Sequence, residues 1–254
     1  MINQNRTKKY LLYAIGEIVL VVIGILIALQ INNQNDERKA EDAIKKFYKA
    51  TILDLNEASN ATTAQLDWFK NYQDLNFSIY KQAKGEIPKD RLKNYNPLIW
   101  SHSFRPLITE NYKSKFEQIN NEKIQELFRD ILWREQLTVE AVNEWNDMKF
   151  QTLRPYFFKN HIYNAETSFN QPPYEFITSS SVDLLKVDKL IEQYDTSEFE
   201  QILFELRHKT SWVIISLESL EEANKNLKSA LGFYLEDDLE SLKAIEPLKY
   251  YMND

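Results

Sequence analysis

Cysteine is missing from this sequence, and glycine and histidine are scarce, with four and three copies in 254 residues. Without cysteine the chain has no disulfides, thiolate metal ligands or cysteine nucleophiles. So little glycine argues against an all-β fold, whose tight turns need it, and excludes glycine-rich phosphate-binding loops. The formal net charge of −7 provides no basic face for nucleic acid. What remains is a chain rich in Leu, Glu and Lys, a composition that favours helices.

One long apolar stretch stands at residues 10–31, interrupted only by Glu17 and Gln30 among strongly polar residues. As a helix it would be about 33 Å long, close to the thickness of the hydrocarbon core of a bilayer. A buried core helix is the first alternative, but no neighbouring sequence of similar character is there to cover it. A cleaved signal peptide is the second, but the stretch is too long and no small-x-small cleavage site follows it. We therefore predict an uncleaved transmembrane helix at 10–31, a short tail at 1–9 and a soluble domain at 32–254.

The orientation of this helix is predicted from the basic residues at its ends. Arg6, Lys8 and Lys9 crowd its N-terminal side, whereas the far side begins with a neutral run of Asn and Gln. Basic residues next to a membrane span favour the cytoplasmic side. The prediction is a cytoplasmic N-terminus with the bulk of the chain outside.

Glu17 lies inside the predicted span, where a lone carboxylate is costly and calls for a partner or a role. Positions three and four residues apart through Glu17 share one helix face, occupied by Ala14, Val21, Gly24 and Ala28. Small residues let membrane helices approach closely, so these positions and Gly16 are predicted helix-packing residues. Helix association, with Glu17 bonding to its counterparts, is one interpretation. Snorkelling of Glu17 to the interface and a proton or ion pathway are the others.

The soluble part shows helical periodicity over 36–83, 121–154, 182–193, 198–231 and 236–251, with irregular segments at 84–111 and 156–180. Gly85 and Pro88 should end the first helix and Pro155 should end or kink the second. In 198–231 the apolar residues keep a strict 3-4 alternation, with Thr210 and Asn224 as polar breaks, which resembles a coiled-coil seam. Ser197 and Glu200 form a capping-box pair at its start, and Gly232 is the predicted C-cap.

The sequence contains no recognised catalytic motif. Glu205 and His208 have the spacing of half a di-iron site, but the second such motif is absent, so a solvated helix face is expected. The serines at 179–181 indicate ordinary turn chemistry. Aromatic residues near His102 and His161 could line a pocket or a contact surface, although capping of the core is the preferred interpretation. No catalytic, cofactor-binding or metal-ligating residue is predicted.

Residues 9–39 resemble the N-terminal signature of a family of bacterial membrane proteins of unknown function, found mainly in Bacteroidetes. The resemblance is carried by YLLYAIGEI at 10–18 and GILIALQINN at 24–33. A weaker similarity follows around residues 109–131. The sequence departs from the signature at Gln34, where family members carry Trp. The resemblance implies a bacterial inner-membrane protein in which Glu17 belongs to a recurring pattern, and it implies no activity.

The predicted fold is all-α, with an N-terminal transmembrane helix that continues into an elongated helical bundle with coiled-coil-like packing. The predicted function is a non-enzymatic membrane-anchored scaffold or interaction protein that forms a homo-oligomer through the span and the first long helix. Its expected partners are the lipid bilayer, further copies of itself and other membrane proteins. The alternatives are a subunit of an ion- or proton-conducting complex with Glu17 in the pathway, and a sensor with a ligand-binding external domain.

Overall fold

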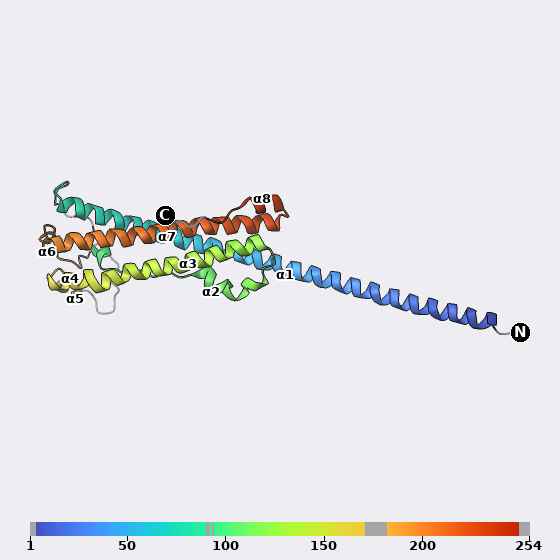
Figure 1. Cartoon of the computed structure of the whole chain (residues 1–254). Coiled ribbons are helices and arrows are strands. Elements are labelled where there is room, and N and C mark those ends of the chain that lie inside the picture. The colour runs from blue at the N-terminus through green and yellow to red at the C-terminus, as the bar shows by residue number, and fades with distance from the viewer. Residues whose placement is uncertain (1–3, 90–91, 93, 171–181, 249–254) are drawn as a thin grey trace. The chain divides into compact units, whose positions relative to one another are not determined.

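The computed structural model describes residues 4–89, 92, 94–170 and 182–248, with side chains from residue 13 onward except that of residue 118. These residues form helices and helical turns and contain no strand, so the fold is all-α (Figure 1). One isolated antiparallel bridge joins Tyr163 and Leu185. By internal contacts the chain divides into two compact units, Met1–Thr51 and Ile52–Asp254. The serine run at 179–181 and the end of the last predicted helix, 249–251, lie outside the described residues.

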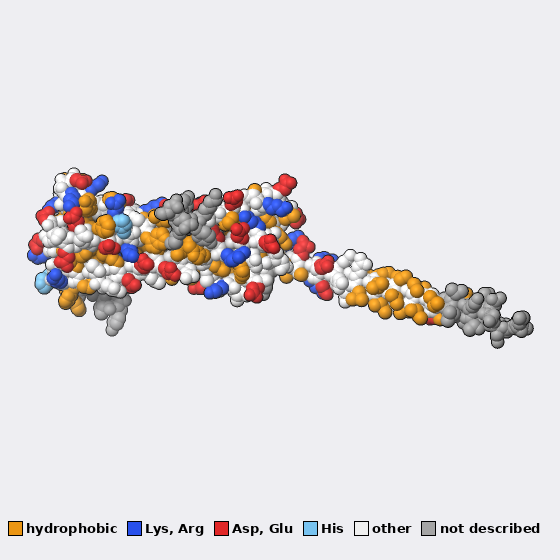
Figure 2. All heavy atoms as spheres, viewed as in Figure 1, with side chains coloured by type: hydrophobic (Ala, Val, Ile, Leu, Met, Phe, Trp, Pro, Cys, Tyr) orange, Lys and Arg blue, Asp and Glu red, His pale blue; other side chains and the backbone are white. Residues whose placement is uncertain are grey.

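The first unit consists of the N-terminal part of helix α1, which spans Gln4–Ala83 and ends in the second unit. No proline interrupts its 80 residues, so the apolar stretch and the predicted helix at 36–83 form one continuous helix, as expected. Within the described chain, α1 is the one helix that is long and apolar enough to cross a membrane, and none of its apolar window is buried. Figure 2 shows this stretch as a band of hydrophobic side chains.

The second unit is a bundle of three long helices: α1 from Ile52 onward, α3 (Glu122–Met148) and α7 (Ser197–Leu235). Helix α7 runs antiparallel to α1 and α3. Along their contacts, residue numbers fall on α7 as they rise on the partner helix. Ser59 bonds to Glu221 and Asn76 bonds to the carbonyl of Leu203. Trp145 in α3 donates to Thr210 in α7. Figure 1 shows the three helices side by side.

Short elements connect and cap the three long helices. Their bounds are η1 Asn96–Leu98, α2 Leu107–Tyr112, η2 Lys113–Gln118, η3 Lys149–Leu153, α4 Arg154–Lys159, α5 Ala165–Phe169, α6 Val187–Ile191 and α8 Leu239–Ala244. Two of these elements are much shorter than the sequence predicted. Helix α6 lies within the helix predicted at 182–193, and α8 lies within the helix predicted at 236–251. The segment at 84–111 is less irregular than expected, because it contains η1 and the start of α2. At its beginning Gly85 adopts a positive φ of 72° that favours glycine, and α1 ends there as predicted.

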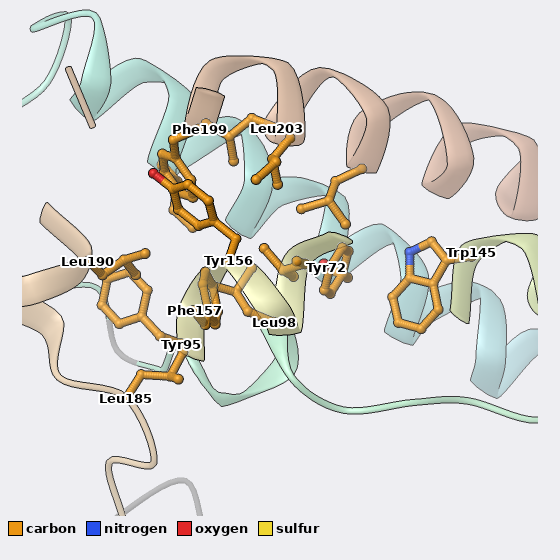
Figure 3. Packing of buried hydrophobic residues seen from close by; sticks show 14 of the residues in the cluster. Tyr72, Tyr95, Leu98, Trp145, Tyr156, Phe157, Leu185, Leu190, Phe199 and Leu203 are labelled. Carbon is orange, nitrogen blue, oxygen red and sulfur yellow. The ribbon is translucent and has the colours of Figure 1, made fainter. Parts of the chain in front are cut away.

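Aromatic and aliphatic side chains from all three long helices fill the core. Tyr72, Leu98 and Trp145 are almost fully buried and lie in one cluster (Figure 3). Beyond them Tyr156 stacks on Phe199, with 5.8 Å between ring centres. The predicted inward positions of α3 are buried, and so is every position of the α7 seam, including Thr210 and Asn224. The three long helices therefore pack together through the periodic apolar faces that the sequence shows.

The helix ends differ in detail from the sequence prediction. Thr196 caps α7 by accepting from the backbone N–H of Phe199, whereas Ser197 is the first helical residue. Glu200 pairs instead with Lys84 across the bundle, at 2.6 Å. Gly232 lies inside the helix, which continues to Leu235. The capping-box and C-cap predictions were wrong because a neighbouring threonine offers the same side-chain acceptor and the helix tolerates an internal glycine.

Pro155 does not end the second long helix. Between Met148 and Arg154 the backbone widens into the π-helical turn η3, in which the N–H of Arg154 bonds to the carbonyl of Lys149. Pro155 then occupies the first turn of α4, where its missing N–H leaves no bond unmade. Helical backbone therefore continues past the proline to Lys159.

Candidate functional site

All six predicted site residues lie on α1, and each of their side chains or glycine positions is exposed. Ala14, Glu17, Val21, Gly24 and Ala28 share one face by helical spacing, as the sequence predicted. Among the described side chains none pairs with the carboxylate of Glu17. A Cβ added at Gly24 would meet nothing within 4 Å, and the same holds for Gly16.

A shallow hollow lies beside Glu17 on the surface of α1. Its lining residues are Tyr13, Gly16, Glu17, Leu20 and Val21. The hollow exists because Gly16 has no side chain, so the helix backbone is accessible there.

A second polar centre, not predicted from the sequence, surrounds Lys149 in the core of the bundle. Its side chain is 1% exposed. The Nζ atom donates to the carbonyl of Pro97 at 2.8 Å and to that of Trp100. It also lies 3.9 Å from the ring centre of Trp145 and 4.8 Å from that of Tyr72. Carbonyl dipoles and ring faces thus stand in for the carboxylate that usually accompanies a buried lysine.

Burial lowers the pKa of the Lys149 amine well below its ordinary value, and the positive charge of Arg154 adds to the effect. The half-buried ring of His102 lies above Trp68, with 3.8 Å between ring centres. Desolvation, followed by repulsion from Lys149, lowers the pKa of His102 to about 4. At neutral pH His102 is therefore an uncharged member of the aromatic cluster.

A lysine with a depressed pKa can act as a nucleophile or a base in catalysis. The amine of Lys149, however, is covered by protein and engaged by two backbone carbonyls from the segment that follows α1. Nearby, Asn146 exchanges two hydrogen bonds with the backbone of His102. Together these contacts fasten the connecting segment to α3, which is a structural role.

The aromatic residues of the irregular segments mostly cap the core. Tyr156 and Phe157 are buried, which confirms the preferred interpretation for them, whereas Phe158 and His161 are exposed. Glu205 and His208 lie on the exposed face of α7, as expected. Among the described residues no group of three or more His, Cys, Asp or Glu side chains is placed to hold a metal ion.

Three further buried charged side chains lie on α3, those of Asp130, Arg134 and Glu135. Arg134 donates to Asp130 at 2.9 Å and also bonds to Ser219 of α7, and both charged side chains are at least nine-tenths buried. Glu135 accepts from the backbone N–H groups of Ile108 and Thr109, at 2.9 and 2.6 Å. Its carboxylate therefore caps the start of α2, although burial still raises its pKa.

No protein-family model matches this chain, and comparison with curated proteins and with solved structures found no match.

Proposed function

We propose that this protein is a non-enzymatic, membrane-anchored scaffold or interaction protein, and that it assembles into a homo-oligomer through the apolar part of α1. The anchor is the segment 10–31, in a bacterial inner membrane. The N-terminus lies in the cytoplasm and the bundle in the periplasm. In this arrangement the bundle presents a contact surface to other membrane or periplasmic proteins.

The exposure of the apolar segment is the observation that supports the anchor. Every side chain from 13 to 34 is exposed, and thirteen of them are large and hydrophobic. Burial of each such side chain is worth about 1.5–3 kcal/mol, so leaving them in water would forfeit on the order of 20 kcal/mol or more. Nothing in the described chain covers them, and a bilayer has the thickness to do so.

Self-association is supported by the face that contains Glu17, Gly24 and Ala28. Its small residues leave the backbone open to close approach by an identical helix. Glu17 buried between copies would be able to hydrogen-bond to its counterpart, which lessens the penalty of a lone polar group in lipid. This supports an oligomer built on one shared face.

The mass of the protein in detergent tests the assembly. After subtraction of the bound detergent, the mass of the wild type should exceed that of one copy, 30.2 kDa. Gly24→Leu should shift the measured mass towards that of the monomer. Val19→Leu adds bulk on the opposite side of the same helix and should leave the mass unchanged. A monomeric wild type would refute the homo-oligomer, and equal oligomeric masses for all three proteins would refute assembly through the face that contains Gly24.

Orientation is tested by labelling, for which the absence of native cysteine is an advantage. Ser229→Cys places a thiol on an exposed position of α7, and Asn5→Cys places one before the apolar segment. A membrane-impermeant maleimide applied to spheroplasts should label the first variant and spare the second. The reverse pattern would invert the topology, and release of the protein from membranes by alkaline carbonate would remove the anchor.

A further inference from the structure

A groove lies between α1 and α7 on the surface of the bundle, in the second unit. It encloses ≈ 190 Å³. Its lining residues are Asn76, Phe77, Tyr80, Glu200, Gln201, Leu203, Phe204 and Arg207. Residues 76–80 of α1 and 200–207 of α7 therefore form its walls, and the long-range bonds that join these helices hold it in shape.

The walls of the groove are aromatic and accessible. Phe77 and Tyr80 from α1 are 36% and 38% exposed, and Phe204 from α7 is 54% exposed. Large aromatic side chains usually pack inward, so three of them at one groove are unusual for a surface without a ligand. The ring of His208 lies against that of Phe204, tilted by 50° with 4.3 Å between ring centres, and extends the aromatic wall.

The groove carries one uncompensated positive charge. The guanidinium of Arg207 lies over the ring of Phe77, 4.7 Å from its centre, and no described carboxylate pairs with it. The acid of the groove, Glu200, is neutralised by Lys84 at 2.6 Å. A guanidinium with free donors next to an apolar wall is the arrangement that binds a carboxylate attached to an apolar body.

The floor of the groove holds an unused hydrogen-bond acceptor. Asn76 is 3% exposed, and its amide nitrogen donates to the carbonyl of Leu203 at 3.2 Å. Its side-chain oxygen has no hydrogen-bond donor among the described residues. A buried acceptor left unpaired is unfavourable by about 1–3 kcal/mol, so a ligand N–H at this position would be favourable.

The volume limits the size of the ligand. Pockets for drug-sized molecules usually enclose about 300–1,000 Å³, so this groove is suited to a smaller body. From the three kinds of group that line it, we infer that the groove binds an N-acylated hydrophobic amino acid. The carboxylate pairs with Arg207, the side chain lies among Phe77, Tyr80 and Phe204, and the amide N–H donates to Asn76.

Equilibrium dialysis of the full chain in lipid nanodiscs, with empty nanodiscs as the blank, tests this site. N-acetylphenylalanine is the probe, and it is expected to bind to the protein above the blank. N-acetylphenylalanine amide lacks the charge, and 3-phenylpropanoate lacks the N–H. Each should bind about tenfold or more weakly, the loss typical of one charge-assisted or buried hydrogen bond.

Two variants locate the binding. Arg207→Gln should weaken binding of N-acetylphenylalanine about tenfold or more and should bind the amide like the wild type. Arg129→Gln is the matched control, because Arg129 is also exposed and lies over a ring, that of Phe116, outside the groove. Absence of binding above the blank, equal binding of acid and amide, or equal effects of the two substitutions would overturn the site. The oligomer is measured separately, so failure of either proposal leaves the other intact.

Discussion

The side-chain nitrogen of Lys149 lies 3.9 Å from the ring centre of Trp145, one turn earlier on α3 and its π-helical continuation. The indole N–H of the same tryptophan donates to Thr210 of α7 at 3.0 Å. Trp145 is therefore contacted on its face by the amine of Lys149 and bonded across the bundle at its edge. This residue joins the connecting segment, α3 and α7 in one polar and aromatic centre.

Replacement of Lys149 by methionine should alter how stability depends on pH. The pKa of this lysine is lower in the folded than in the unfolded chain, so between those two values the unfolded chain binds more protons. The free energy of unfolding of the wild type should then rise with pH towards 10.5, by up to about 1.4 kcal/mol per pH unit, relative to Lys149→Met. Urea unfolding in detergent from pH 7 to 10.5 measures it. Lys228→Met, at an exposed position of α7, should not change the slope.

The lowered pKa of His102 predicts that the protein loses stability in acid. Its pKa of about 4 in the folded chain lies below the ordinary 6.5, so protonation favours the unfolded chain as the pH falls from 6.5 to 4. Over that window the wild type should lose roughly 1–3 kcal/mol more than His102→Phe, which keeps an aromatic ring against Trp68 but does not titrate. His208→Phe is the exposed control. Parallel acid unfolding of the wild type and His102→Phe would contradict the assignment.

The buried ion pair of Asp130 and Arg134 should be far more sensitive to the loss of one charge than of both. Asp130→Ala leaves the guanidinium buried without its carboxylate, and a loss of about 3 kcal/mol or more is expected. Asp130→Leu combined with Arg134→Met should recover most of that loss, because the two apolar side chains need no partner. Thermal or urea unfolding of the single and double variants decides the point. A double variant no more stable than Asp130→Ala would show that the pair is favourable in itself.

Asn224 should limit the stability of the bundle. It is 2% exposed, and neither its side-chain oxygen nor its nitrogen has a hydrogen-bond partner among the described residues. Asn224→Leu replaces the amide by an apolar group of similar volume, so the free energy of unfolding should rise by about 1–2 kcal/mol. Asn143→Leu, on an exposed position of α3, is the control. A less stable Asn224→Leu would mean that the amide stabilises the bundle.

Periodicity explains which helices and buried faces were predictable. The α7 seam from Phe199 to Leu231 repeats every three or four residues, and each of its positions is buried as predicted. The short elements were harder to predict, because α6 and α8 contain only five and six residues, too few for a helical period to show. The predicted ends of α7 were wrong for a similar, local reason. Thr196 and Ser197 are chemically alike, and only the direction of the incoming chain selects between them.

The buried charged residues of α3 and η3 follow the apolar periodicity of the sequence. Lys149 follows Val142 and Trp145 at the spacing of the apolar face, and Arg134 follows Ile131 in the same way. A charge at such a position must be buried with a partner or disrupt the helix packing. Periodicity thus points to buried charges, but it does not identify their partners.

The sequence alone determined the all-α class, the apolar segment of α1, the continuous helix that follows it and the buried faces of α3 and α7. These are local properties, set by residues within a few turns of one another. Tertiary structure alone decided which carbonyls surround Lys149, that Arg134 bonds to Ser219, and that a groove forms at Arg207. Those partners lie 49, 85 and more than one hundred residues apart in sequence. Only the packing of the long helices against one another and of the connecting segment against α3 and η3 brings such residues within bonding distance.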